Sequence, residues 1–352
     1  MTDNTRPATR VTQLPRSPVT MRDVARAAGV SRMTVSRALK KDSPISQETR
    51  DRILKVVREM NYVPDQMAGS LTTKRSGFVA VLVPSLNNLH FAETVQALTE
   101  ELEAINQQIL LGYTNYSTER EEQLVETMLR RRPEALVLSY DGHSDRTMAL
   151  LGEAHIPVIE LWERPTAPLQ HTVGFSNRSA AAAMTRGLID RGYRNIAFLG
   201  EAEDAWTRGA ARRAGWHDAM TTAGLSTRRL MKFGKPPLSI EAGAQAVPRL
   251  LSDFPDTDCI FCVSDAPAFG ALSALTGSGR TVPGDIGLAG FGNFEVSRFA
   301  TPAITTVRVD PKRIGRATGR LLADLLDESR PHGGATRHLP VDVELSFRGS
   351  TR

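Results

Sequence analysis

Residues 19–40 read VTMRDVARAAGVSRMTVSRALK, and this stretch sets the fold of the N-terminal part of the chain. Thr20 can cap a first helix, with Asp23 three residues later as its capping-box partner, and Gly29 breaks that helix. Ser31 can then cap a second helix. Because apolar residues recur at helical spacing in both segments, the stretch predicts two short helices joined by a glycine turn.

A third amphipathic helix is predicted after Ser46, in QETRDRILKVVREMNY. The three helices would share a small core of Val24, Ala25, Ala28, Val35, Ala38, Leu39, Ile53, Leu54, Val57 and Met60. The second helix would leave Arg32, Met33, Thr34, Ser36 and Arg37 on its exposed side. In a helix-turn-helix the second helix enters the major groove, where Arg can read guanine and Ser or Thr can contact phosphates or base edges. We therefore expect residues 19–64 to bind DNA; a plain helical hairpin is the alternative.

The charge of the chain is concentrated at its beginning. Residues 1–77 hold fifteen Lys or Arg and seven Asp or Glu, a net charge of +8, whereas the remainder has a net charge of −3. Cationic side chains gain affinity for nucleic acid by displacing counterions from phosphates. This asymmetry indicates a DNA-binding head on a nearly neutral body, and a solvated basic tail is the alternative. Residues 1–18 are expected to be a disordered basic arm.

Residues 65–75 are predicted to form a hinge between head and body. Pro64 ends the third helix, and DQMAGSL is long enough for only two helical turns. Such a helix could become ordered on DNA and place Leu71 as an apolar wedge in the minor groove. A passive linker is the alternative.

Residues 76–352 alternate between strand and helix patterns. The apolar strand segments are FVAVLVP, QILLGYT, ALVLSY, PVIEL, IAFLG, CIFCV and IGLAGFG, with amphipathic helices between most of them. This order predicts an α/β body with two doubly wound parallel sheets. Ligands of such sheets bind beyond the carboxyl ends of the strands. The segments at those ends are polar and aromatic, and they suit a hydroxylated ligand.

Several classes of function lack their sequence motifs. The segments that follow the strands contain no P-loop, GxGxxG, GxSxG or HExxH pattern, so we expect no enzyme, no cofactor and no metal. Cys259 and Cys262 could suggest redox or metal chemistry, but in a strand these two residues point to opposite faces. The sequence has neither a long apolar run nor a secretory signal, which predicts a cytoplasmic protein without a membrane segment.

The run from Val19 to Leu71 resembles the DNA-binding head and hinge of the lactose-repressor (LacI/GalR) family. The body resembles the periplasmic-binding-protein-like core of the same family, so the resemblance covers nearly the whole chain. TVSR and the segment from NYVP into the hinge are its most specific motifs. Within the family, VPSLNNLHFAE and TVGFSN are similar to the repressors that respond to gluconate and 2-ketogluconate.

The resemblance implies a homodimer that binds double-stranded DNA at a near-palindromic operator, with one head on each half-site. The implied DNA contacts are Thr20, Ser31, Arg32, Met33, Thr34, Ser36, Arg37, Tyr62, Ala68 and Leu71. Leu71 would be the wedge at the operator centre. The chain lacks the leucine-rich tail of the tetrameric lactose repressor, so we expect a dimer.

The resemblance also places a small-molecule effector in a cleft between two subdomains, with the chain crossing between them near residues 176 and 306. The implied effector contacts are Ser85, Asn88, Phe91, Trp162, Arg208, Arg212, Asp265 and Asn293. Arg208 and Arg212 are one helical turn apart, and two guanidinium groups on one face suit a carboxylate. The alternative is that either arginine only solvates a helix surface.

Two departures from the family pattern also favour a sugar acid over a neutral sugar. Ser264 stands where many relatives have Asn, and Gly292 where many have Asp. A missing carboxylate weakens hydroxyl recognition but also removes a charge that would repel an acid. We expect the effector to close the cleft and to lower operator affinity. The alternatives are a co-repressor, a neutral sugar or purine, a protein partner of a global regulator, or a cytosolic sugar-acid binding protein or enzyme.

Overall fold

The computed structural model describes residues 19–39, 43–64, 76–139, 142–202, 207–327, 329 and 335–352. The chain divides into two compact units, Met1–Lys74 and Arg75–Arg352. The predicted basic arm and the predicted hinge, with Ala68 and Leu71, lie outside the described residues.

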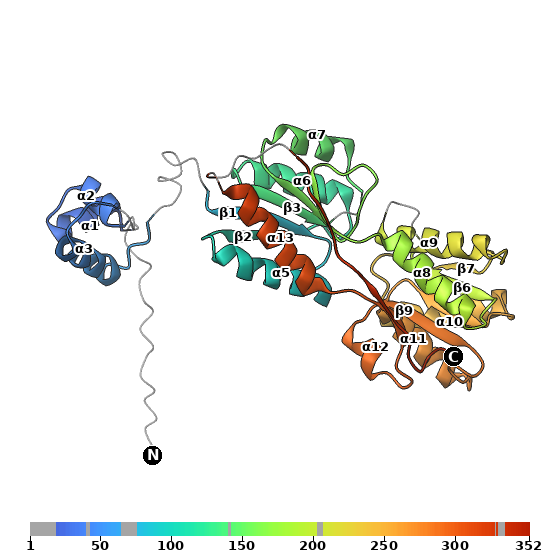
Figure 1. The fold of residues 1–352 in the computed structure, drawn as a ribbon. Helices are drawn as coiled ribbons and strands as arrows, with labels where there is room; N and C mark the ends of the chain where they lie inside the picture. The colour runs from blue at the N-terminus through green and yellow to red at the C-terminus, as the bar shows by residue number, and fades with distance from the viewer. Residues whose placement is uncertain are drawn as a thin grey trace, which may run out of the picture. The chain divides into compact units, whose positions relative to one another are not determined.

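The first unit contains the three predicted helices, α1 (Met21–Ala28), α2 (Arg32–Ala38) and α3 (Gln47–Glu59) (Figure 1). The Asp23 carboxylate accepts hydrogen bonds from the backbone N–H and the hydroxyl of Thr20 and fixes the start of α1. Gly29 ends α1 in the left-handed conformation, with a φ of 65°. The hydroxyl of Ser31 accepts a hydrogen bond from the N–H of Thr34, 3.1 Å away, and caps α2.

The core of this unit contains more residues than predicted and lacks one that was predicted. It consists of Val24, Ala25, Ala28, Val35, Ala38, Ile53 and Tyr62, with Met21, Val30, Leu39, Ile45, Val56, Val57 and Met60 packed against them. Leu54 does not belong to it, because Ile53, Val56, Val57 and Met60 form the inward stripe of α3 and Leu54 falls beside that stripe. Tyr62 was expected at the DNA, but its side chain is only 8% exposed and packs in this core.

The second unit begins with a parallel sheet. Its strands are β1 (Phe78–Val83), β2 (Gln108–Tyr113), β3 (Ala135–Ser139), β4 (Val158–Leu161), β5 (His171–Gly174) and β11 (His338–Pro340), in the order β11-β5-β4-β3-β1-β2. The helices that accompany it are α5 (Leu89–Glu103), α6 (Thr118–Leu129), α7 (Asp145–Glu153) and α13 (Pro311–Leu326). We call this sheet with its helices the first lobe.

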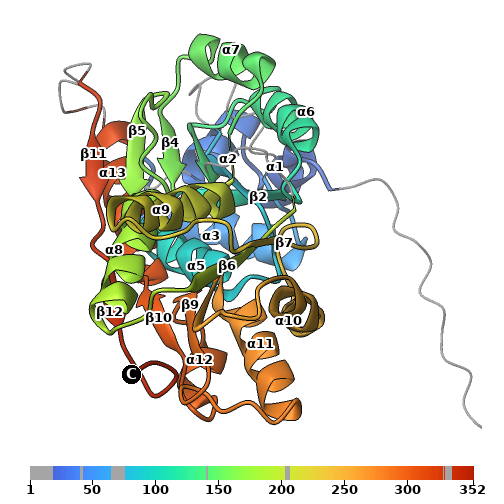
Figure 2. The ribbon, with the colours of Figure 1, turned by 90° about the vertical axis from the view of Figure 1, so that its right-hand side faces the viewer.

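The second lobe repeats the arrangement (Figure 2). Its strands are β6 (Ile196–Gly200), β7 (Leu230–Lys232), β8 (Cys259–Cys262), β9 (Gly287–Gly292), β10 (Thr305–Arg308) and β12 (Glu344–Ser346), in the order β12-β10-β9-β8-β6-β7. Only β12 runs antiparallel to its neighbour. The helices are α8 (Asn177–Asp190), α9 (Arg208–Thr222), α10 (Ile240–Asp253), α11 (Asp265–Gly277) and α12 (Glu295–Phe299). The predicted pair of doubly wound sheets is confirmed.

The two cysteines lie in β8, where the strand pattern placed them. Both are free and buried, and burial raises the pKa of both thiols. Cys259 packs in the cluster that contains Phe198 and Trp216, whereas Cys262 packs in the cluster on the other face of the sheet. Their side chains therefore point away from each other, as the strand period requires.

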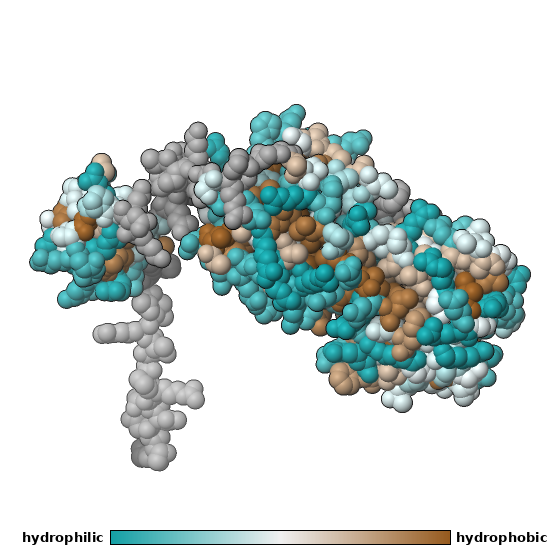
Figure 3. Space-filling view, viewed as in Figure 1, coloured by the Kyte–Doolittle hydropathy of each residue, from teal (hydrophilic) through white to brown (hydrophobic). Residues whose placement is uncertain are grey.

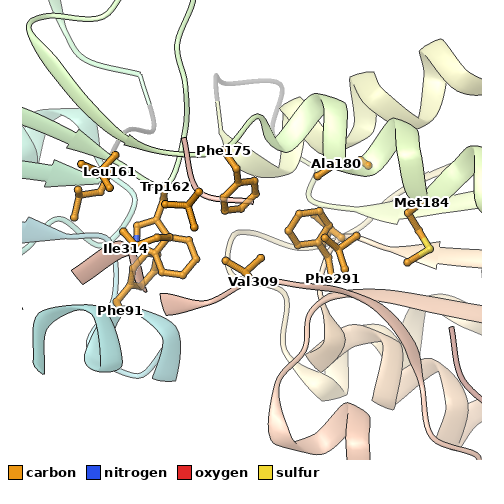
Figure 4. Packing of buried hydrophobic residues seen from close by; sticks show 14 of the residues in the cluster. Phe91, Leu161, Trp162, Phe175, Ala180, Met184, Phe291, Val309 and Ile314 are labelled. Carbon is orange, nitrogen blue, oxygen red and sulfur yellow. The ribbon is translucent and has the colours of Figure 1, made fainter. Parts of the chain in front are cut away.

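The chain passes between the lobes three times: after β5, after β10, and between β11 and β12. The family resemblance implied passages near residues 176 and 306. The third passage was not predicted, and it joins two strands of only three residues each. The N–H of Val341 donates to the carbonyl of Gly174, 2.8 Å away, which ties the first passage to the third. One buried cluster reaches through this region, with Trp162, Phe175, Val309 and Phe291 in succession (Figure 4).

Apolar side chains also reach the surface of this unit, where brown patches continue from the first lobe to the second (Figure 3). Among the residues that the structure describes, no helix is both long enough and apolar enough to cross a membrane.

Candidate functional site

The first candidate site is the exposed side of α2. Arg32 and Arg37 are exposed, Met33 is 65% exposed, and Thr34 and Ser36 are half-buried. The Thr34 hydroxyl lies 2.9 Å from the Ser31 hydroxyl, so both take part in the start of the helix. The side of α2 that faces solvent thus carries two guanidinium groups and one flexible apolar side chain, a composition that suits base edges and phosphates.

The second candidate site is a cavity of about 460 Å³ between the lobes. The segments that follow β1, β4, β6, β8 and β9 contribute to its lining, so it lies at the carboxyl ends of strands from both sheets. Six of the eight predicted effector contacts line it: Ser85, Asn88, Phe91, Trp162, Arg208 and Arg212. The volume is within the range of small-molecule sites.

Arg212 is held firmly at this cavity. Its Nε donates to Oδ1 of Asn177 at 2.8 Å, its Nη1 donates to the carbonyl of Val263 at 2.8 Å, and its Cζ lies 3.8 Å from the centre of the Phe291 ring. Burial, together with repulsion from Arg208, lowers its pKa to about 10, so it stays charged at neutral pH. Within the described part of the chain, Nη2 has no hydrogen-bond partner and is available to a ligand.

Asn177 orients Arg212 because the Asn177 side chain is itself held by hydrogen bonds on the side away from Arg212. Its Nδ2 donates to the carbonyl of Trp162 and to Oε2 of Glu163, each 2.9 Å away. These bonds turn Oδ1 towards Arg212. The buried Glu163 carboxylate therefore acts on the cavity through Asn177, and it does not line the cavity itself.

Arg208 lies one turn before Arg212 in α9 and is buried at the cavity. Its Cζ is 5.0 Å from the centre of the Phe91 ring, which belongs to α5 of the first lobe. The two arginines thus approach the same cavity from one helix face, and Arg208 also contacts the opposite lobe.

An aromatic wall lines another side of the cavity. The His90 ring stacks on Phe294 at 3.9 Å between ring centroids and on Trp162 at 5.7 Å. Burial, with the nearby charge of Arg212, lowers the pKa of His90 to about 3, so its ring is neutral at physiological pH. Because His90 and Phe294 come from different lobes, this stack joins the two walls.

Sequence comparisons identify both units. Residues 20–65 match the description "Bacterial regulatory proteins, lacI family", and residues 185–351 match "Periplasmic binding protein-like domain". The "HTH-type transcriptional regulator IdnR" of Escherichia coli (strain K12) is 34% identical over 95% of this chain and 98% of its own length. The chain belongs to the LacI family of transcriptional regulators.

Solved structures of LacI-family regulators have the same fold. A LacI family transcriptional regulator from Silicibacter pomeroyi is 59% identical and superposes with a TM-score of 0.75, covering 78% of this chain and 99% of its own. The lac repressor dimer bound to operator and the anti-inducer ONPF is 25% identical and superposes with a TM-score of 0.82 over 95% of this chain and 99% of its own. This regulator is accordingly a LacI-family DNA-binding repressor.

Two predicted effector contacts of the regulator lie outside the cavity lining. Asp265 is fully buried, accepts hydrogen bonds from Thr306 Oγ1 and the N–H of Phe294, each at 2.7 Å, and positions the loop after β9. Burial raises its pKa to about 6. Asn293 adopts a φ of 62° and accepts a hydrogen bond from Arg348. The neighbouring Ser264, Gly292 and Phe294 line the cavity in their place.

The sequence did not single out several residues that line the cavity of the regulator. No sequence pattern distinguishes His90 or Tyr116 from the neighbouring helix and loop residues. Phe294 is one residue beyond the predicted Asn293. Glu201 was also missed, although it directly follows a predicted strand. The position after a strand was the one signal that could have found Glu201, since ligand sites gather there.

Proposed function

We propose that this LacI-family repressor binds a near-palindromic operator as a homodimer and is released by a sugar acid that occupies the cavity between the lobes. The observation that carries the proposal is the pair Arg208 and Arg212, which line the cavity from one face of α9. Arg can bind a carboxylate in a planar, two-point geometry, and Nη2 of Arg212 is available for it. The aromatic wall would pack against the carbon chain of such a ligand.

The proposed mechanism is a two-state linkage. A ligand that contacts Arg208 and the His90 side of the cavity at once favours the closed arrangement of the lobes. Closure would change the spacing of the two heads and weaken operator binding, and coupling of this kind is typically about 1 to 3 kcal/mol. We expect the effector to release the operator rather than to tighten operator binding, by analogy with regulators of catabolic genes.

The homodimer rests on apolar side chains at the edge of the first lobe. Leu86, Leu111 and Tyr113 are exposed, and β2, which carries the last two, is an edge strand. Leu86 and Leu111 line the same surface hollow, and exposed apolar side chains that lie together are typical of an interaction surface. A second copy of the chain is the occupant we propose, and the similarity to the lac repressor dimer supports it.

The test measures operator binding by fluorescence anisotropy and ligand binding by calorimetry, with gluconate, 2-ketogluconate and ribose as probes. We expect a sugar acid alone to release the operator. Arg212→Gln should weaken sugar-acid binding about 10- to 100-fold, because a hydrogen bond to a charged group contributes about 1.5 to 3 kcal/mol. Arg249→Gln, which removes an exposed charge from α10, serves as the matched control.

Tight binding of ribose without binding of either acid would overturn the effector class and leave DNA binding intact. Tighter operator binding in the presence of an acid would make the acid a co-repressor.

A further inference from the structure

Glu201 is a negative charge placed among the arginines of the cavity. It follows β6, lines the cavity, and directs its carboxylate at the first turn of α9. A Cβ added at Gly209 would lie 2.1 Å from one carboxylate oxygen of Glu201 and 2.9 Å from the other. The absence of a side chain at Gly209 therefore makes room for this carboxylate beside the positive end of the helix.

The surroundings of Glu201 are cationic, but its hydrogen bonding is incomplete. Arg212, Arg213 and Arg208 all favour its charged form, yet burial outweighs them and raises its pKa. Across the described residues, no other side chain donates a hydrogen bond to its carboxylate. The carboxylate is thus attracted to the α9 arginines but is not fixed by a two-point arginine contact.

We infer that Glu201 is a tethered substitute for the ligand's carboxylate: in the empty cavity it balances the charge of the α9 arginines, and an acidic ligand binds by displacing it. This inference rests on the proposed function. It makes Glu201 a specificity-determining residue, because a ligand without a carboxylate cannot replace the charge that Glu201 supplies. It also sets the affinity, since every acidic ligand must compete with an internal one.

The opposing interpretation is that Glu201 accepts hydrogen bonds from ligand hydroxyl groups. The two roles predict opposite results when its charge is removed. If Glu201 accepts hydrogen bonds from hydroxyl groups, removing its charge should weaken the binding of gluconate and also of glucitol, the alcohol with CH₂OH in place of the carboxylate. A competing carboxylate would hinder gluconate alone.

The experiment compares gluconate and glucitol binding by calorimetry to the full-length protein, to Glu201→Gln and to Glu153→Gln. Glu153 is exposed at the end of α7, so its replacement removes the same charge away from the cavity. We expect Glu201→Gln to bind gluconate about tenfold more tightly, the effect of removing one close repulsion. Glucitol affinity should not rise, and Glu153→Gln should match the unaltered protein. Where the unaltered protein binds gluconate, unchanged or weaker gluconate binding by Glu201→Gln would overturn the inference.

A second measurement does not depend on the effector. Thermal unfolding is followed in sodium sulfate and in sodium chloride at equal ionic strength. Sulfate raises the unfolding temperature of proteins in general. The informative quantity is therefore how much more sulfate raises the unfolding temperature of Glu201→Gln than that of the unaltered protein and of Glu153→Gln. We expect this additional gain, because an inorganic anion can then occupy the vacated position.

The two proposals fail in different ways. If no protein binds either sugar acid but sulfate selectively stabilises Glu201→Gln, the effector class is wrong and the inference about Glu201 stands. If the unaltered protein binds gluconate but Glu201→Gln does not bind it more tightly, the inference alone is wrong. If no protein binds a sugar acid and sulfate gives Glu201→Gln no additional gain in unfolding temperature, both proposals are overturned.

Discussion

His143, Glu121 and Glu160 form a buried charged cluster in the first lobe. Nδ1 of His143 lies 2.6 Å from Oε1 of Glu121, and Nε2 lies 3.5 Å from Oε1 of Glu160. Burial alone would lower the pKa of His143, but the two carboxylates outweigh it and raise the pKa to about 9. With a side-chain exposure of 1%, the imidazolium is well shielded from solvent and salt.

This cluster predicts a pH dependence of stability. A pKa raised above the unfolded value of 6.5 contributes stability that is complete below pH 6.5 and is lost as the pH rises towards 9. We expect the free energy of unfolding to fall by about 2 to 3 kcal/mol over this interval. Urea unfolding at several pH values measures it, and His143→Asn should remove this part of the dependence. An identical pH profile for His143→Asn would contradict the assignment.

Individual site residues were predicted unevenly from the sequence. Arg208 and Arg212 could be paired because helix periodicity alone puts residues four apart on one face. Asp265 and Asn293 could not be excluded, because whether a side chain faces the cavity or its own loop depends on backbone dihedrals such as the φ of 62° at Asn293. The position of Glu201 beside Gly209 depends on a contact between two segments and has no local signature.

At the scale of elements, the start of α2 offers a test of the DNA-reading helix. Ser31 caps α2 and is also a predicted DNA contact. Ser31→Ala should destabilise the helix by about 1 kcal/mol, whereas Ser31→Gly should cost only a few tenths, since glycine tolerates the cap geometry. Hydrogen exchange of α2 amides in the full-length protein measures this difference.

Operator affinity separates the two roles of Ser31. If the hydroxyl only caps the helix, Ser31→Gly should bind the operator almost as well as the unaltered protein. If the hydroxyl contacts DNA, both variants should bind more weakly by a similar factor.

Several of the strands that the sequence predicted share a physical property. β1, β3, β6 and β8 are buried on both faces, so they read as continuous apolar runs. β7, β11 and β12 have three residues each, which is too short for a periodic signal. The long helix α13 was missed as well, although Asp310 and Pro311 mark its start.

At the scale of the whole molecule, the proposed homodimer predicts a mass of twice the 38.5 kDa of one chain. Leu111, 41% exposed on the edge strand β2, lies in the proposed interface. Leu111→Glu should yield monomers and weaken operator binding, because an unpaired charge is costly to bury. Sedimentation velocity measures the mass. Met148→Glu, at a 39% exposed position on α7, is the matched control and should stay dimeric. A monomeric unaltered protein, or a dimeric Leu111→Glu, would contradict the proposed interface.

The three passages between the lobes restrict how the two lobes of the second unit can move relative to each other. A single connecting strand would let one lobe swivel in any direction, whereas three connections, two of them tied by the Val341 to Gly174 hydrogen bond, leave little freedom except bending about one shared axis. Bending about one axis has few end points, that is, few limiting arrangements of the two lobes. A ligand too small to span both walls would therefore leave the population of those end points nearly unchanged, however well it fits one wall.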